Sequence, residues 1–132
     1  MADVNPYQAY LQNTVMMANH KELPALLYDG VLKFLGRAQK AIEAGEVPAA
    51  HEALIRAQEI INHLHATLDR NYEISADLAA IYEYCLRRLA EANLKKDAAI
   101  VAEVAELIKD LASTWRQAMA RVGTNGAASG GS

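Results

Sequence analysis

The side chains of this chain that could carry out chemistry are three of its histidines, one cysteine and a few acidic residues. Glu59 and His63 are four residues apart, which places two metal ligands on one helix face. A di-iron helical bundle, however, needs a glutamate three residues before a histidine. None of His51, His63 and His65 has a glutamate at that position. The sequence therefore predicts no metal centre, and nothing in it indicates a cofactor.

Histidine phosphotransfer is a second use of helical bundles. It requires an exposed histidine with a nearby lysine to balance the phosphate charge. The segments around the three histidines, "PAAHEALIR" and "INHLHATLD", contain no lysine. Their acidic neighbours Glu52, Glu59 and Asp69 would repel a phosphate group. A histidine phosphotransfer module is therefore kept only as an alternative.

Nucleophilic catalysis has one candidate, Cys85, which lies on the apolar stripe of an expected helix. A small buried hydrophobic residue is the more common role for a cysteine in that position. Glu103, Glu106 and Asp110 share a helix face, which is typical of a solvated surface. Because no acid, base and nucleophile occur together, we predict that the chain is not an enzyme.

Four amphipathic helices are expected to position these side chains. Apolar residues recur at helical spacing in four segments: residues 22–43, 50–68, 78–92 and 101–122. Residues typical of helix ends lie between them: Gly45 as a C-terminal cap, Pro48 in a first turn, and Ser75 and Asp97 as N-caps. Four such helices joined by short connections predict an all-α, antiparallel four-helix bundle.

The bundle is expected to occupy residues 20–122, between two flanking segments. In residues 1–19, Asn5 as an N-cap and the proline after it predict a short cap segment, helical or not, laid across the bundle. The first long helix either starts near Pro24 or has an irregular first turn. Residues 123–132, "GTNGAASGGS", are of low complexity and predict a flexible tail.

Composition narrows the choice of partners and compartment. The net charge of -3 and the pI of about 5.8 argue against a nucleic-acid partner. The single cysteine excludes an internal disulfide and is compatible with a reducing cytosol. No apolar run approaches the ~20 residues of a membrane span, and no secretory signal is evident. We expect a soluble cytoplasmic protein without membrane insertion.

Two features suggest a binding surface. Gly30 lies inside a strong helical pattern, where glycine costs ~1 kcal/mol relative to alanine. It indicates close helix packing or close approach of a partner backbone, and neighbouring Tyr28 is either a core residue or a groove wall. The segment around Ile55 has more apolar surface than three neighbouring helices can cover. That surplus predicts a groove for an amphipathic helix, or a surface for self-association.

Several stretches together resemble one family. "NPYQAYLQN", "LLYDGVLKFL", "LIRAQEIINHL", "TLDRN", "YEYCLRRLAEAN" and "STW" are similar, in order and spacing, to the FliS family of flagellin-specific flagellar secretion chaperones. The resemblance covers residues 5–119. It implies a cytoplasmic bundle that binds the disordered C-terminal segment of flagellin, prevents premature polymerisation and delivers it to the flagellar type III export apparatus, without nucleotide.

The resemblance also implies site residues. The N-terminal cap residues are Asn5, Tyr7, Tyr10 and Leu11, which cover part of the groove when flagellin is absent. The flagellin groove residues are Leu27, Tyr28, Gly30, Ile55, Ala57, Gln58, Ile61, Leu64 and Asn93. Asn93 either hydrogen-bonds the client or closes its helix. The alternatives to the chaperone are a self-associating structural bundle and the phosphotransfer module.

Overall fold

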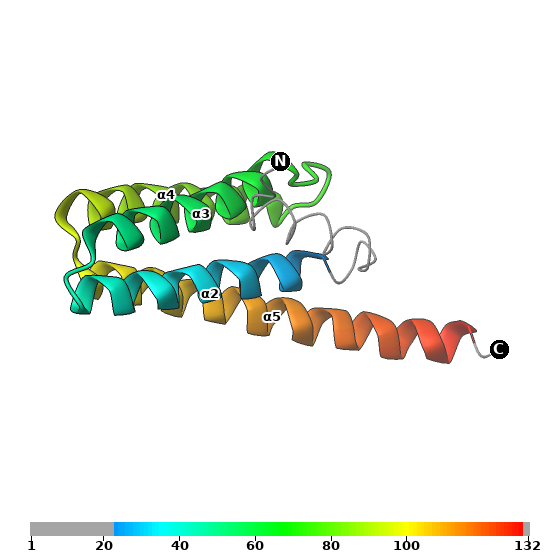
Figure 1. Cartoon of the computed structure of the whole chain (residues 1–132). Coiled ribbons are helices and arrows are strands. Elements are labelled where there is room, and N and C mark those ends of the chain that lie inside the picture. Colours follow the sequence, from blue (N-terminus) through cyan, green and yellow to red (C-terminus); the bar gives the residue numbers. More distant parts are fainter. Residues whose placement is uncertain (1–22, 131–132) are drawn as a thin grey trace, which may run out of the picture.

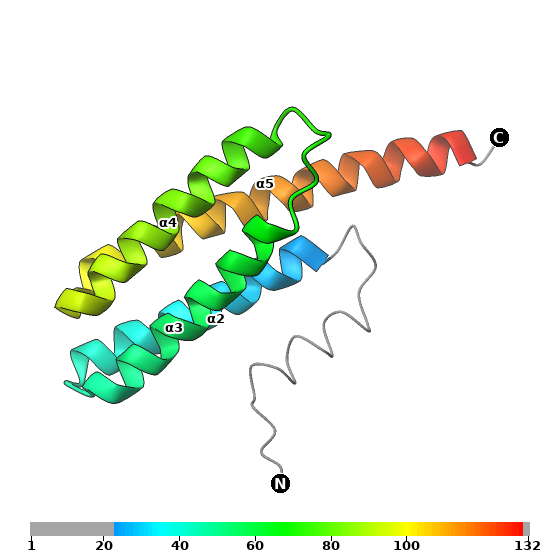
Figure 2. The same cartoon turned by 90° about the horizontal axis from the view of Figure 1, so that it is seen from above.

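The structure is a computed structural model that describes residues 23–130, with side chains up to residue 120. Its helices are α2 (Leu23–Glu43), α3 (Val47–Ala66), α4 (Ser75–Lys95) and α5 (Ala98–Gly130). Figures 1 and 2 show an antiparallel bundle in which α2 and α4 each pack against both α3 and α5. The predicted all-α four-helix bundle is confirmed. No helix in this part of the chain is long and apolar enough to cross a membrane.

The connection between α2 and α3 is a Schellman motif. Gly45 adopts a φ of +72° after the last turn of α2, where a residue without Cβ is favoured. The backbone N–H of Glu46 donates to the carbonyl of Ala41 at 2.8 Å, and the N–H of Gly45 donates to the carbonyl of Ile42 at 3.0 Å. Pro48 lies in the first turn of α3. The predicted positions of Gly45 and Pro48 are confirmed.

The connection between α4 and α5 is equally short. Lys96 follows α4 in the left-handed conformation, with a φ of 53°. The Asp97 carboxylate then accepts hydrogen bonds from the backbone N–H groups of Ala99 at 2.9 Å and Ile100 at 3.4 Å. The predicted N-cap role of Asp97 is therefore confirmed, and it fixes the start of α5.

The longest connection, residues 67–74, joins α3 to α4. Here the sequence prediction of an N-cap at Ser75 is wrong, because Ser75 is already the first helical residue and is buried. The preceding residue is Ile74, which has helical dihedral angles and no capping side chain. The connection therefore brings a large apolar side chain, not a capping hydroxyl, to the start of α4.

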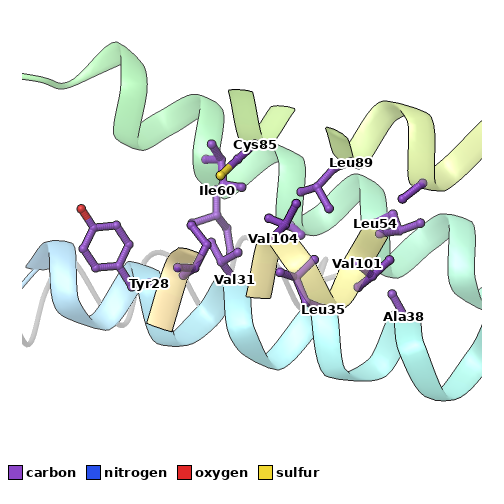
Figure 3. Close-up of a cluster of buried hydrophobic side chains, with 14 of the residues drawn as sticks. Tyr28, Val31, Leu35, Ala38, Leu54, Ile60, Cys85, Leu89, Val101 and Val104 are labelled. Atoms are coloured by element: carbon purple, nitrogen blue, oxygen red, sulfur yellow. The ribbon is translucent and has the colours of Figure 1, made fainter. Parts of the chain in front are cut away.

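Aliphatic side chains fill the interior between the helices. Alanines such as Ala38 and Ala57 have no exposed surface and let neighbouring helices approach closely. In the segment 50–68, where apolar residues were expected at helical spacing, Ala50, Leu54, Ala57, Ile61 and Leu64 are buried, and Leu68, which follows the end of α3, is half-buried. Ile60 is wholly buried in the core. Figure 3 shows Tyr28 at one end of this cluster, its hydroxyl pointing away from the aliphatic side chains.

Charged side chains join α4 to α5 outside the core. The Glu103 carboxylate accepts hydrogen bonds from the Tyr84 hydroxyl and, at 2.9 Å, from Arg88 Nε. Arg88 also pairs with Glu91, which pairs with Lys95 at 2.9 Å. These bonds hold the pKa of Glu103 below its usual value. The spacing of Glu103 had suggested a solvated acidic face, but its carboxylate also joins α5 to α4 through hydrogen bonds.

The ends of the described region differ from the predicted boundaries. α2 is described from Leu23, the first described residue, with Pro24 next to it, and the start of the helix near Pro24 stays a prediction. α5 continues to Gly130, past residue 122, and Figure 1 shows it projecting beyond the other helices. Extending an existing helix adds one hydrogen bond per residue without a new nucleus. The flexibility expected of residues 123–132 stays a prediction, and the cap segment, 1–19, lies outside the described residues.

Candidate functional site

A pocket of about 540 Å³ opens at the end of the bundle where α3 and α4 are connected. The beginning of α2, the end of α3, the start of α4 and the second half of α5 all contribute to it. Its lining residues are Pro24, Tyr28, Leu64, Thr67, Leu68, Asp69, Tyr72, Ile74, Ser75, Leu78, Tyr82, Trp115 and Met119. Most of them are apolar, and the volume is in the range of ordinary binding pockets.

The 67–74 connection supplies exposed apolar side chains to the lining. Tyr72 is 65% exposed and Ile74 is 58% exposed. Both lie in the sequence "DRNYEIS", which is otherwise mostly polar. Large apolar side chains that stay in water beside an apolar pocket indicate a surface that another molecule covers.

Two tyrosines from different helices place a hydrogen-bonded pair of hydroxyl groups in the lining of the pocket. The hydroxyls of Tyr28 on α2 and Tyr82 on α4 are 2.6 Å apart and share a hydrogen bond. Their rings are tilted by 44°, with centroids 6.5 Å apart, so they meet through the hydroxyls and not by stacking. Burial raises the pKa of both phenols, and both groups are therefore neutral at physiological pH.

An ion pair lies near the same end of the bundle. Arg116 on α5 donates to the carboxylate of Asp29 on α2 at 2.6 Å, and both side chains are about half exposed. Arg116 follows Trp115 in the sequence and Asp29 follows Tyr28, and both of these neighbours line the pocket. An exposed pair of this kind contributes ~0–1 kcal/mol to stability. Its effect is to hold α5 against α2 where α5 leaves the bundle.

The predicted groove residues divide into two groups. Those with buried side chains or backbone are Leu27, Tyr28, Gly30, Ala57, Ile61 and Leu64; those that are half-buried are Ile55, Gln58 and Asn93. Of the nine, only Tyr28 and Leu64 line the pocket. The structure therefore does not gather the predicted groove into one open surface. A partner-binding role for the others stays a prediction.

Asn93 has a partner within the bundle. Its amide forms a 3.0 Å hydrogen bond with Nδ1 of His51, which links the end of α4 to the beginning of α3. The end of α4 and the beginning of α3 lie at the end of the bundle opposite the connection between α3 and α4 (Figure 1). A second histidine, His65, pairs with Glu83 at 2.9 Å across the same two helices. Both histidines thus take part in contacts between α3 and α4.

The remaining candidates for chemistry do not form a site. Cys85 is fully buried, and burial raises the pKa of its thiol to about 11. It is therefore a protonated core residue, as the sequence had indicated. Within residues 23–120, no three or more histidine, cysteine or acidic side chains are grouped to hold a metal ion.

Several residues of the pocket were not among the predicted site residues. Leu68, Leu78, Tyr82 and Trp115 lie in the segments expected to form amphipathic helices, but helical spacing alone does not bring them together as a site. Tyr72 and Ile74 were overlooked altogether. A signal was available, because two large apolar residues in a polar connection between helices are unusual.

Fold and pocket together define the class of this protein: an all-α bundle with an open apolar pocket at one end. The sequence profile described as "Flagellar protein FliS" matches residues 3–122. The chain is 46% identical over 119 residues to the flagellar secretion chaperone FliS of Bacillus subtilis (strain 168), covering 90% of each chain. It is 40% identical over 113 residues to the flagellar secretion chaperone FliS of Salmonella typhimurium, covering 83% of this chain and 84% of that protein. The chain belongs to the FliS family.

A solved structure supports the fold independently. A crystal structure of a flagellar chaperone from bacteria matches with a TM-score of 0.74, covering 88% of this chain and 96% of that one, at 15% identity. The family and its chaperone members confirm the predicted resemblance, and they confirm a chaperone role in flagellar secretion and not that of an enzyme.

Proposed function

We propose that this chain binds the disordered C-terminal segment of flagellin in the bacterial cytoplasm. Binding keeps flagellin from polymerising before export, and the complex delivers it to the flagellar type III export apparatus. The observation that carries the proposal is the apolar pocket with Tyr72 and Ile74 exposed beside it. In a flagellar secretion chaperone, an uncovered apolar surface of this kind is the natural place for the cargo.

The chemistry of the pocket fits an amphipathic helical segment. A client helix with apolar side chains three or four residues apart can place them between Leu68, Leu78 and Trp115. Covering the half-exposed tyrosine and isoleucine removes apolar surface from water, at ~25 cal/mol per Å². Binding of this kind needs no covalent step, and the resemblance to the family implies that no nucleotide takes part.

The client extends from the pocket along the bundle in this proposal. Ile55 and Gln58 lie half-buried on α3 along this path, whereas the amide of Asn93 on α4 is bonded to His51 within the bundle. Ile55 is not among the side chains that pack against the core cluster, so its apolar surface is available. The buried residues of the predicted groove pack in the core and hold α2 and α3 together, which fixes the position of the half-buried residues.

The N-terminal segment competes for the pocket when flagellin is absent. Leu23, the first described residue, precedes Pro24, which lines the pocket. The eleven residues between Leu11 and Leu23 span at most ~40 Å, far enough for Tyr7 and Tyr10 to reach the pocket. Their side chains then occupy space that the client must take over. This keeps the apolar surface covered and rejects weakly binding peptides.

A pull-down with purified monomeric flagellin tests the proposal. Intact flagellin should be retained, and flagellin lacking its C-terminal segment should not. Equal retention of both forms, or of neither, would contradict the proposal. Light scattering with and without flagellin separates it from the structural alternative, for which a permanent homodimer that ignores flagellin is expected.

A further inference from the structure

The tyrosine pair in the pocket has one more proton than its own hydrogen bond can use. Two hydroxyl groups carry two protons, and the bond between Tyr28 and Tyr82 takes one of them, whichever group donates. Within residues 23–120, neither hydroxyl has another hydrogen-bond partner. Tyr28 is 1% exposed and Tyr82 is 2% exposed, so little of either residue meets bulk water. The pair therefore offers one hydrogen-bond donor beyond its own bond, in a mostly apolar pocket whose other donor-bearing lining residues include Thr67, Tyr72 and Ser75.

The group that accepts this proton must itself tolerate an apolar site. A carboxylate would lose its water and would also meet Asp69, which lines the same pocket. A side-chain amide would bring two N–H donors that need acceptors of their own. Carbonyl groups in the middle of a helix are already bonded, whereas the last four of a helix have no partner within it. A carbonyl in the last turn of an apolar helix meets every requirement.

We infer that the pocket receives the C-terminal turn of a client helix and that the Tyr28–Tyr82 pair donates a hydrogen bond to one of its free main-chain carbonyls. The inference rests on the proposed function, because it takes the client to be the flagellin segment. Apolar side chains of that turn fill the space around Leu64, Leu78 and Trp115. The donor makes the pocket select a helix that ends there over one that passes through.

Phenylalanine variants test the inference because they separate folding from binding. Tyr28→Phe and Tyr82→Phe each leave a lone buried hydroxyl, so each should lower the urea midpoint of unfolding. The double variant removes both hydroxyls and should recover a midpoint close to that of the wild type, since replacing both partners is nearly neutral. Tyr84→Phe, which removes a hydroxyl on the same helix that bonds to Glu103, is the control for binding.

The affinity for a flagellin C-terminal peptide should follow a different order: the single variants should stay close to the wild type, and the double variant should bind more weakly. Each single variant keeps one donor in the pocket and should bind within about threefold of the wild type, as should Tyr84→Phe. The double variant has neither hydroxyl of the pair, and its affinity should fall at least about tenfold because the client carbonyl loses this donor. Equal binding by the wild type and a folded double variant would overturn the inference but leave the proposed function intact. If the wild type does not bind the peptide, the proposed function itself fails.

Two further measurements identify the acceptor. Replacing one backbone amide at a time by an ester in the flagellin peptide weakens single carbonyl acceptors. One ester in the last helical turn should reduce binding to the wild type and not to the double variant, and coupling to a side-chain oxygen instead would overturn the inference. The double variant is also measured without residues 1–17. If the double variant instead binds the peptide more tightly than the wild type, and this difference disappears when residues 1–17 are removed from both proteins, the acceptor belongs to this chain's own N-terminal segment, and the client assignment is wrong.

Discussion

Truncating Ile74 should weaken the binding of flagellin without affecting the fold. Ile74→Ala removes the outer carbon atoms of a side chain that is 58% exposed and lines the pocket. Each of the three carbon atoms is worth ~0.8 kcal/mol when buried, and only the exposed part is left for the client to cover. The loss is then about 1.4 kcal/mol, or about tenfold in Kd. Folding stability should change by less than about 0.5 kcal/mol, as is usual for an exposed side chain.

Leu94→Ala is a matched control for this prediction. Leu94 is 85% exposed, lies in the last turn of the helix that Ile74 precedes, and loses the same number of carbon atoms. At 1.5 Å per residue it is about 30 Å from Ile74 along α4. Calorimetric titration with the flagellin C-terminal peptide should therefore show wild-type affinity for this variant. Equal losses in both variants, or an unchanged Kd for Ile74→Ala, would refute the assignment of the pocket.

Three other predictions concern the rest of the bundle. Ile55→Asp should weaken flagellin binding while circular dichroism stays helical, because the side chain is half-buried outside the core cluster; retained binding would count against a groove on α3. Deleting residues 1–17 should tighten binding about thirtyfold if cap docking is favourable by ~2 kcal/mol, and unchanged affinity would rule out competition. The pKa of Glu103 is lowered by its bonds to Tyr84 and Arg88, so its stabilisation is present above the usual value of 4.5 and lost as pH falls below it. Glu103→Gln should therefore reduce the acid-side slope of unfolding stability, and an identical slope in both proteins would show that the contact does not form.

The fold could be predicted because its information is local. Apolar side chains three and four residues apart fix each helix and the face that it buries. Gly45 and Asp97 carry the backbone preferences of helix ends in their own chemistry, and both were placed correctly. The prediction of an N-cap at Ser75 was wrong because a hydroxyl before an apolar run is only one way to begin a helix. At this site the helix starts after Ile74 instead.

The site could not be predicted in the same way, because it is made by several elements meeting at one end of the bundle. Several residues of the expected groove lie in the core of the bundle; Ala57 and Ile61, for example, have no exposed surface. Open apolar surface appears instead around the 67–74 connection, which contributes Tyr72 and Ile74. Helical periodicity does not give the path of that connection or its distance from Trp115 on α5.

Site-specific crosslinking tests the central claim most directly. A photoreactive residue is placed at position 74, and at position 94 in a control, and each protein is irradiated with monomeric flagellin. The account predicts a crosslink from position 74 to the C-terminal segment of flagellin and none from position 94. A crosslink from position 74 to another part of flagellin, or none when flagellin is bound, would contradict the claim that the pocket holds this segment.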